Sequence, residues 1–257
     1  MTHTLAAPTQ HSTEPAAEFR TRTPFTWRDY TAIGVIVAFF AGIAINTFAI
    51  TDPTVMTAYQ FLMPAVLAAV LLTAYGPLLA SHWRAFRARL GRNLVIVLGS
   101  VITLHVLLFL VRLPAGDLFD KGPIEPRAAP VEAMTATGLP MLLLTLLASF
   151  GPVLVAFVED TVYRHTLLAR IPVWDRGIML RASVVVANAV VFGAMHVFAF
   201  GGSLLATVPY MVIGLAMNLL FLWTKNLWVV LGSHIVFNSL PIFSTAFIVV
   251  MRVTGAL

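Results

Sequence analysis

Long apolar blocks separated by short polar segments run along most of the chain. Each block approaches the roughly 20 residues that a helix needs to cross the hydrocarbon core of a bilayer. They cover about residues 30–50, 59–80, 93–111, 139–158, 182–200, 204–223 and 227–251, and the fourth can continue as helix to residue 171, before Pro172. The pattern predicts an all-α, polytopic bundle of about seven to eight transmembrane helices.

Two polar segments stand outside the apolar blocks. The first 27 residues or so are rich in Thr, Ala and Pro, which is typical of a disordered tail, and they lack the apolar core of a signal peptide. A second segment, rich in Pro and Gly, runs from Leu113 to about Thr135 and predicts a loop. We therefore expect a cytoplasmic tail over residues 1–27 and one transmembrane domain over residues 28–257.

The composition narrows the class of protein further. Hydrophobic residues make up 59% of the chain and charged residues 11%, whereas a soluble domain carries about 25% charged residues. The absence of Cys excludes disulfides, thiolate nucleophiles and Cys-ligated metals. The net charge is +5, but the basic residues form no stripe interleaved with aromatic residues, so we expect contact with lipid and none with nucleic acid.

The basic residues predict how the bundle is oriented in the membrane. Most of them lie before the first block or in alternate connections after it: Arg20, Arg22, Arg28, Arg84, Arg87, Arg89, Arg92, Arg164, Arg170, Arg176, Arg181 and Lys225. Because cytoplasmic segments carry an excess of Lys and Arg, this side should be cytoplasmic. The Arg-, Ala- and Val-rich composition suggests a bacterium, so we expect an integral protein of a bacterial plasma membrane with a cytoplasmic N-terminus.

Polar residues inside apolar blocks are costly and usually have a function, and the chain holds three clusters of them. The first is Glu159-Asp160-x-x-x-Arg164, at the end of the fourth block. On an α-helix, Asp160 and Arg164 are four residues apart and can pair, whereas Glu159 lies on a different part of the surface. A carboxylate left unpaired in a poorly solvated site can act as a general base. The alternative is a charged helix end at the membrane interface.

The second and third clusters each contain a His. In Phe192-x-x-x-His196, the Phe lies one turn before the His and could pack against its ring. In His234-x-x-x-Asn238, the spacing places both side chains on one face, where they could hold a water or stabilise an oxyanion. Ser233 beside His234 does not make a catalytic dyad, because adjacent helical residues point in different directions. Taken alone, His196 could also simply bond a neighbouring helix.

Together the three clusters resemble the motifs of the CPBP family of intramembrane proteases, which is named for CAAX proteases and bacteriocin-processing enzymes and is also called the ABI family. The family motifs are Glu-Glu-x-x-x-Arg, Phe-x-x-x-His and His-x-x-x-Asn/Asp. The matching residues are Glu159 and Arg164, Phe192 and His196, and His234 and Asn238. The resemblance covers about residues 139–245. It departs from the family at Asp160, which keeps the charge of the second Glu on a shorter side chain.

The resemblance implies an endopeptidase that acts on a membrane-associated peptide or protein. The implied catalytic residues converge on one water: Glu159, His196, His234 and Asn238. The implied supporting residues are Asp160, Arg164 and Phe192. In this mechanism Glu159 is the general base, His196 fixes the water, and the other two catalytic residues stabilise the tetrahedral oxyanion, without a cofactor. The alternative places Zn²⁺ among Glu159, His196 and His234, although the chain lacks the His-Glu-x-x-His signature of zincins.

Two functions other than proteolysis stay open from the sequence. A catalytically silent scaffold or immunity protein could share the fold, in which case alanine at Glu159, His196 or His234 would leave the cellular phenotype intact. A transporter could also use polar residues within the membrane, but no internal repeat is evident in the chain, which weighs against one.

Overall fold

The structure, a computed structural model, describes residues 24–113 and 138–256. Within these two ranges all the regular elements are helices, which confirms the all-α bundle. Six helical segments of the described chain are long and apolar enough to cross a membrane, and a bent pair of helices at the C-terminal end makes a seventh. Most of the expected tail, and nearly all of the expected loop before residue 138, lie outside the described residues, so both stay predictions.

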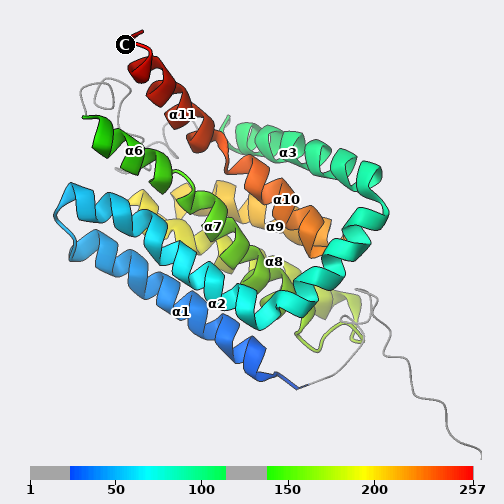
Figure 1. Cartoon of the computed structure of the whole chain (residues 1–257). Coiled ribbons are helices and arrows are strands. Elements are labelled where there is room, and N and C mark those ends of the chain that lie inside the picture. Colours follow the sequence, from blue (N-terminus) through cyan, green and yellow to red (C-terminus); the bar gives the residue numbers. More distant parts are fainter. Residues whose placement is uncertain (1–23, 114–137, 257) are drawn as a thin grey trace, which may run out of the picture.

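The first two helices form an antiparallel pair along one side of the bundle (Figure 1). Helix α1 (Trp27–Phe48) begins with a capping box made by Thr26 and Asp29. Helix α2 (Pro53–Ala88) begins after Asp52, whose side chain accepts hydrogen bonds from two backbone amides of the first turn. It continues well past residue 80, where the sequence predicted its end, so that one residue alone separates it from the next helix.

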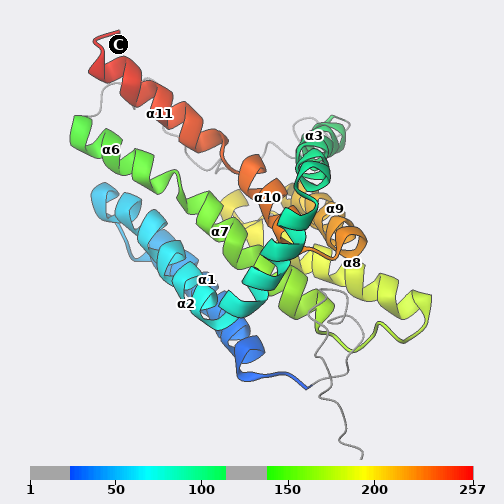
Figure 2. The same ribbon diagram turned by 45° about the vertical axis from the view of Figure 1, so that its right-hand side comes forward.

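Helix α3 (Leu90–Arg112) turns away from α2 and packs mainly against α9 (Val208–Thr224) and α10 (Leu227–Phe237). Figures 1 and 2 show that α3 leaves the upper end of α2 and lies near α10. Only 11% of its apolar window is buried within the protein, so most of its surface is left for lipid. This placement brings the C-terminal half of α3 close to the last third of the chain.

The fourth span consists of three helical pieces that follow one another. They are α6 (Leu139–Ala148), α7 (Gly151–Glu159) and the π-helix η2 (Asp160–Ala169). The next span is α8 (Ile178–Ala194), which ends in the 3₁₀ turn η3 (Met195–Phe200). A second short 3₁₀ turn, η4 (Leu205–Thr207), then leads into α9. The predicted spans over residues 139–158, with the extension to 171, and over 182–200 and 204–223 are therefore confirmed.

The last predicted span is not one helix. It divides into α10 and α11 (Leu240–Val253), whose axes differ by 41°. Pro241 is the second residue of α11, and proline is tolerated in the first turn of a helix but not in its interior, where it lacks a donor and collides with the preceding turn. The helix therefore breaks just before it, and Asn238 lies at this break rather than inside a helix.

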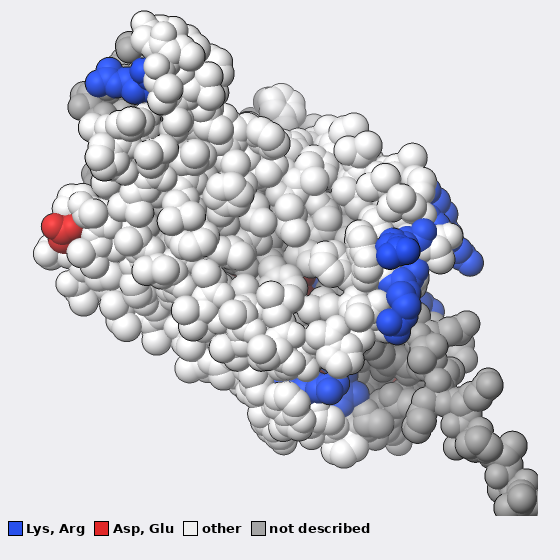
Figure 3. Space-filling view, viewed as in Figure 1, with Lys and Arg blue, Asp and Glu red and all other residues white. Residues whose placement is uncertain are grey.

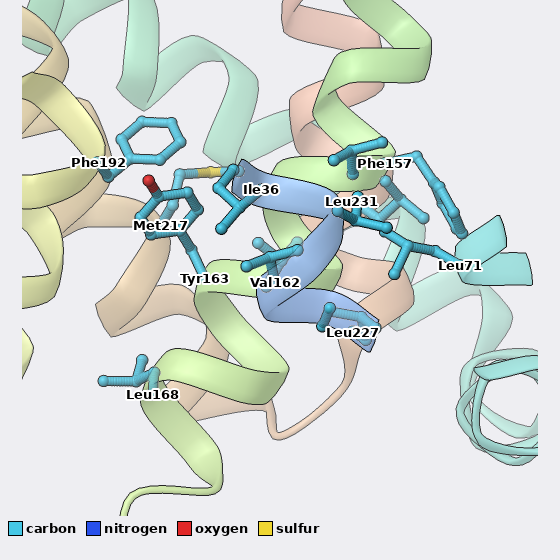
Figure 4. Close-up of a cluster of buried hydrophobic side chains, with 14 of the residues drawn as sticks. Ile36, Leu71, Phe157, Val162, Tyr163, Leu168, Phe192, Met217, Leu227 and Leu231 are labelled. Atoms are coloured by element: carbon cyan, nitrogen blue, oxygen red, sulfur yellow. The ribbon is translucent and has the colours of Figure 1, made fainter. Parts of the chain in front are cut away.

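The π-helix η2 runs through the centre of the bundle. Nine of its ten residues are buried, and it contacts α1, α8, α9 and α10. Figure 4 shows Val162 and Tyr163 among side chains from these neighbours, including Ile36, Phe192 and Leu231. In a membrane, close packing holds helices together more than the hydrophobic effect does. The neighbouring helices therefore fix the backbone and the polar side chains of η2.

Charged side chains gather at the ends of the bundle. Figure 3 shows basic residues mainly at one end of the visible face, with a further basic group near the C-terminus. Arg164 is an exception to the sequence prediction, which counted it with the basic connection after the fourth span. It is fully buried, because the helix continues past it to Ala169. The orientation of the bundle in the membrane stays a prediction.

Candidate active site

The first polar cluster lies where an α-helix changes into a π-helix. Glu159 is the last residue of α7 and Asp160 the first of η2. The sequence predicts a regular α-helix over this stretch, and this prediction is wrong. In a π-helix the backbone bonds join residues five apart, as Arg170 N–H does to His165 O at 3.1 Å. Such turns are rare and frequent at functional sites.

Both carboxylates of this cluster face the same imidazole. His234 Nδ1 lies 3.4 Å from Asp160 Oδ2, and His234 Nε2 lies 3.8 Å from Glu159 Oε2. All three side chains are buried, with at most 5% of their surface exposed. A buried imidazole between two carboxylates can take a proton from one side and release it to the other, which suits an acid–base centre.

Asp160 is held on its other side by Arg164. The two side chains are fully buried, and Arg164 Nε lies 3.3 Å from Asp160 Oδ1. The Arg164 guanidinium also lies 4.2 Å from the centre of the Phe192 ring, in a cation–π contact. One positive charge therefore balances Asp160, while Glu159 has His234 as its nearest basic group within ion-pair distance.

Phe192 joins the second cluster to the third. Its ring contacts those of His196 and His234, at centroid distances of 5.5 and 6.2 Å, both edge-on. These contacts bring the two His side chains to one level around a shared aromatic ring.

His196 has one side of its ring fixed by the backbone. Its Nδ1 atom lies 3.1 Å from Phe192 O. A carbonyl oxygen only accepts hydrogen bonds, so Nδ1 carries the hydrogen and Nε2 of the neutral ring keeps its lone pair. His196 is half-buried, and in this tautomer it can accept a hydrogen bond from a water.

Asn238 takes its position from the break between α10 and α11. Its Nδ2 atom donates to Pro152 O at 3.1 Å, on α7 two turns before Glu159. In the described part of the chain its side chain forms no hydrogen bond with Glu159, His196 or His234. Nδ2 carries two hydrogens, and the bond to Pro152 O uses one of them. The other is available to stabilise an oxyanion.

Other polar residues of the spans have structural roles. Ser233 is fully buried and its hydroxyl donates to Val229 O at 2.9 Å, within its own helix. Asn188 donates from α8 to Tyr163 O on η2 at 3.1 Å, and Asn218 donates from α9 to Val185 O on α8 at 3.0 Å. Two of the three helices that carry the site are thus tied together through side chain to backbone bonds.

The fit of the site to a metal ion can be judged from its side chains. No group of three or more His, Asp and Glu residues is arranged to hold a metal within residues 24–113 and 138–256. In particular, the proposed zinc ligands Glu159, His196 and His234 do not form such a group here. We therefore derive no catalytic step through a metal.

The comparisons with known proteins bear on this half of the chain. Residues 139–240 match the family described as type II CAAX prenyl endopeptidase Rce1-like. We call residues 139–240 the Rce1-like segment, after the family that they resemble. The match contains all seven residues of the three motifs, and it confirms the resemblance to CAAX-type membrane proteases that the motifs indicated. No curated protein and no solved structure matches the chain.

The Rce1-like segment does not contain the whole environment of the site. Helices α1, α2 and α3 precede it, yet α1 and α2 contact η2 or α7 and α3 contacts α10. Asp29 of α1 forms two hydrogen bonds with Arg170 at the end of η2, at 3.3 and 3.2 Å. The sequence offered no signal for this pair, because an Asp in a first helical turn is also an ordinary capping residue.

Proposed function

We propose that the protein is an intramembrane endopeptidase of the CAAX type, and that Glu159 activates the hydrolytic water. The proposal is supported by the Rce1-like match and, above all, by one geometric relationship. Two buried carboxylates on consecutive residues flank the two nitrogens of His234. Burying three ionisable groups at one point in an apolar bundle costs free energy, so such a cluster usually has a function.

In the proposed reaction the water attacks the carbonyl carbon of the scissile peptide bond while Glu159 accepts one of its protons. His196 holds the water through the lone pair on Nε2. The carbonyl oxygen becomes an oxyanion, which the Asn238 amide stabilises, joined by His234 once its Nε2 atom has taken the proton from Glu159. The C–N bond then breaks, and the proton taken up by Glu159 passes through His234 to the leaving amine. The products are one new carboxylate and one new amine.

Asp160 and Arg164 have supporting roles in this scheme. Asp160 Oδ2 lies 3.4 Å from His234 Nδ1 and favours a proton on that nitrogen, which leaves Nε2 facing Glu159. Arg164 forms an ion pair with Asp160 and lies against Phe192. The two acidic residues, the arginine and the two His side chains are therefore held together. The Asp found in place of the family's second Glu still reaches His234, at 3.4 Å, so we expect the chain to be active.

The substrate is proposed to be a membrane-associated peptide or protein, because the site lies inside the bundle. The test uses purified protein in liposomes with two quenched fluorescent peptides, one carrying a prenylated CAAX end and one carrying an unmodified apolar segment. We expect cleavage of at least one, with a single new terminus in mass spectrometry, and loss of cleavage in His234→Gln. Equal cleavage by wild type and His234→Gln, or no cleavage of either peptide by the wild type, would contradict the proposal.

The metal-free form of the mechanism has a separate test. Dialysis against a strong chelator, followed by assay in metal-free buffer, should leave the rate within about twofold, because no described group of side chains is arranged to bind a metal. A loss of activity that zinc restores would replace the metal-free scheme with the zinc alternative, while the peptidase function would stand.

A further inference from the structure

Tyr210 lies against the active site although it belongs to none of the three motifs. It is the third residue of α9, and its ring stacks on that of His196 with a centroid distance of 4.4 Å and an interplanar angle of 22°. On its other side it contacts Phe200 at 5.3 Å.

The stack is fixed by the closest helix contact in this part of the bundle. Helices α8 and α9 pack along most of their lengths, and two glycines allow the approach. A Cβ atom on Gly193 would collide with the backbone of Met211, and one on Gly214 would lie 2.7 Å from Phe192 Cδ1. Since Met211 follows Tyr210 directly, the contact at Gly193 sets the position from which Tyr210 meets His196.

His196 needs such a contact because a single hydrogen bond does not fix its ring. The bond from Nδ1–H to Phe192 O holds one atom, but the residue lies in the short 3₁₀ turn η3 and is half-buried. The edge of Phe192 touches the ring from one direction, at an interplanar angle of 63°. The Tyr210 ring lies nearly parallel to the His196 ring and covers one of its faces. The hydrogen bond, the Phe192 edge and the Tyr210 stack together fix the plane of the His196 ring and the direction of Nε2.

We propose that Tyr210 is a positioning residue for the hydrolytic reaction, and that its stacked ring holds His196 so that Nε2 points at the water. This inference rests on the proposed function. Tyr210 acts through His196 and donates no proton to the reaction, so the aromatic ring carries the effect and the hydroxyl does not. A tyrosine that merely filled space between α8 and α9 would affect stability and would leave the turnover of folded enzyme unchanged.

The test compares Tyr210→Phe, which keeps the stack, with Tyr210→Leu, which removes it. We expect Tyr210→Phe to keep kcat within about threefold of the wild type. Tyr210→Leu should lower kcat by about 10²-fold, because a small misplacement of a catalytic group has an effect of this size. Its KM should change less than about threefold. The matched control is Tyr30→Leu on the exposed surface of α1, which should behave as wild type. Equal losses in both Tyr210 variants, or unchanged kcat in Tyr210→Leu, would overturn the inference.

A second measurement does not depend on activity or on the folding of the leucine variant. In protein labelled with ¹⁵N-histidine, assigned with His196→Asn, the ring nitrogens of His196 should report a single Nδ1–H tautomer in the wild type and in Tyr210→Phe. Exchange between tautomers in the wild type would overturn the inference even if the enzyme is active. If instead the wild type cleaves no peptide while the single tautomer is observed, the proposed function fails and the hydrogen bond that orients His196 stands.

Discussion

His234 Nδ1 lies 3.4 Å from Asp160 Oδ2 inside a helical bundle that leaves both side chains almost fully buried. The contact joins the first polar motif of the chain to the third, across 74 residues of sequence. It also explains how the chain accommodates Asp where related motifs have Glu. The π-helical turn that begins at Asp160 places the short side chain within reach of both Arg164 and His234.

Replacing Asp160 by Asn should lower both activity and stability. The variant leaves Arg164 as an uncompensated buried charge, which typically destabilises a protein by about 3–5 kcal/mol, and it removes the carboxylate that lies beside His234 Nδ1. We expect a fall in kcat of about 10²-fold, measured beside a thermal unfolding scan in the same detergent. Asp160→Glu restores the charge and should recover part of the rate. A rate for Asp160→Asn equal to that of the wild type would remove Asp160 from the mechanism.

Asn238 provides a test against the family pattern, which allows Asp at this position. Here Asn238 Nδ2 donates to Pro152 O, and an ionised Asp would present an acceptor to that carbonyl. We expect Asn238→Asp to lower kcat by about 10²–10³-fold, the usual effect of losing an oxyanion donor. Asn46→Asp in α1 is the matched control, since it makes the same change outside the site. Full activity in Asn238→Asp would show that no amide donor is needed.

The close contact of α8 and α9 can be tested at Gly214. Alanine there would place a Cβ 2.7 Å from Phe192 Cδ1 and 3.2 Å from Ala189 O. Phe192 would have to move, and its contacts with both His rings would change. We expect a lower Tm and a lower kcat. Gly34→Ala is the control, because its Cβ would meet no atom within 4 Å and alanine favours a helix by about 0.5–1 kcal/mol over glycine. Identical behaviour of the two variants would contradict the packing described.

Helix α1 should be required for a stable site although it precedes the Rce1-like segment. Asp29 is 2% exposed and binds Arg170 and the Thr26 backbone amide. Since hydrogen bonds to charged groups contribute about 1.5–3 kcal/mol, Asp29→Asn should lower the free energy of unfolding by that amount. The control is Asp175→Asn, in an exposed ion pair with Arg176. An unchanged Tm for Asp29→Asn would mean that α1 does not hold the end of η2.

The sequence predicted the spans and the residues of the site because both leave local signals. Apolar blocks of membrane-spanning length are visible without any tertiary information, and Glu159, His196 and His234 stand out as ionisable residues within them. Their convergence came from a resemblance to known motifs. Neither the spacing of the motifs nor the composition of the chain could show that Phe192 would lie between the two His rings.

The parts that the sequence missed depend on contacts between distant segments. The π-helical turn at Asp160 and the stacking of Tyr210 on His196 arise from packing in the bundle, and neither has a local motif. The spacing predicted that Arg164 could pair with Asp160, but Arg164 was still counted with a basic connection, because a buried Arg is rare and its contact with Phe192 is recognised only in three dimensions. The break before α11 was different, because Pro241 was visible in the sequence and was given too little weight.

The most direct measurement of the central claim is the kcat of Glu159→Gln on a cleaved peptide, with wild type and Asp175→Asn prepared alongside. Gln preserves the size of the side chain and removes its ability to accept a proton. We predict a fall of at least about 10³-fold with an unchanged elution profile and Tm, within the range expected for loss of a general base. A folded Glu159→Gln variant that turns over within about threefold of the wild type would contradict the account.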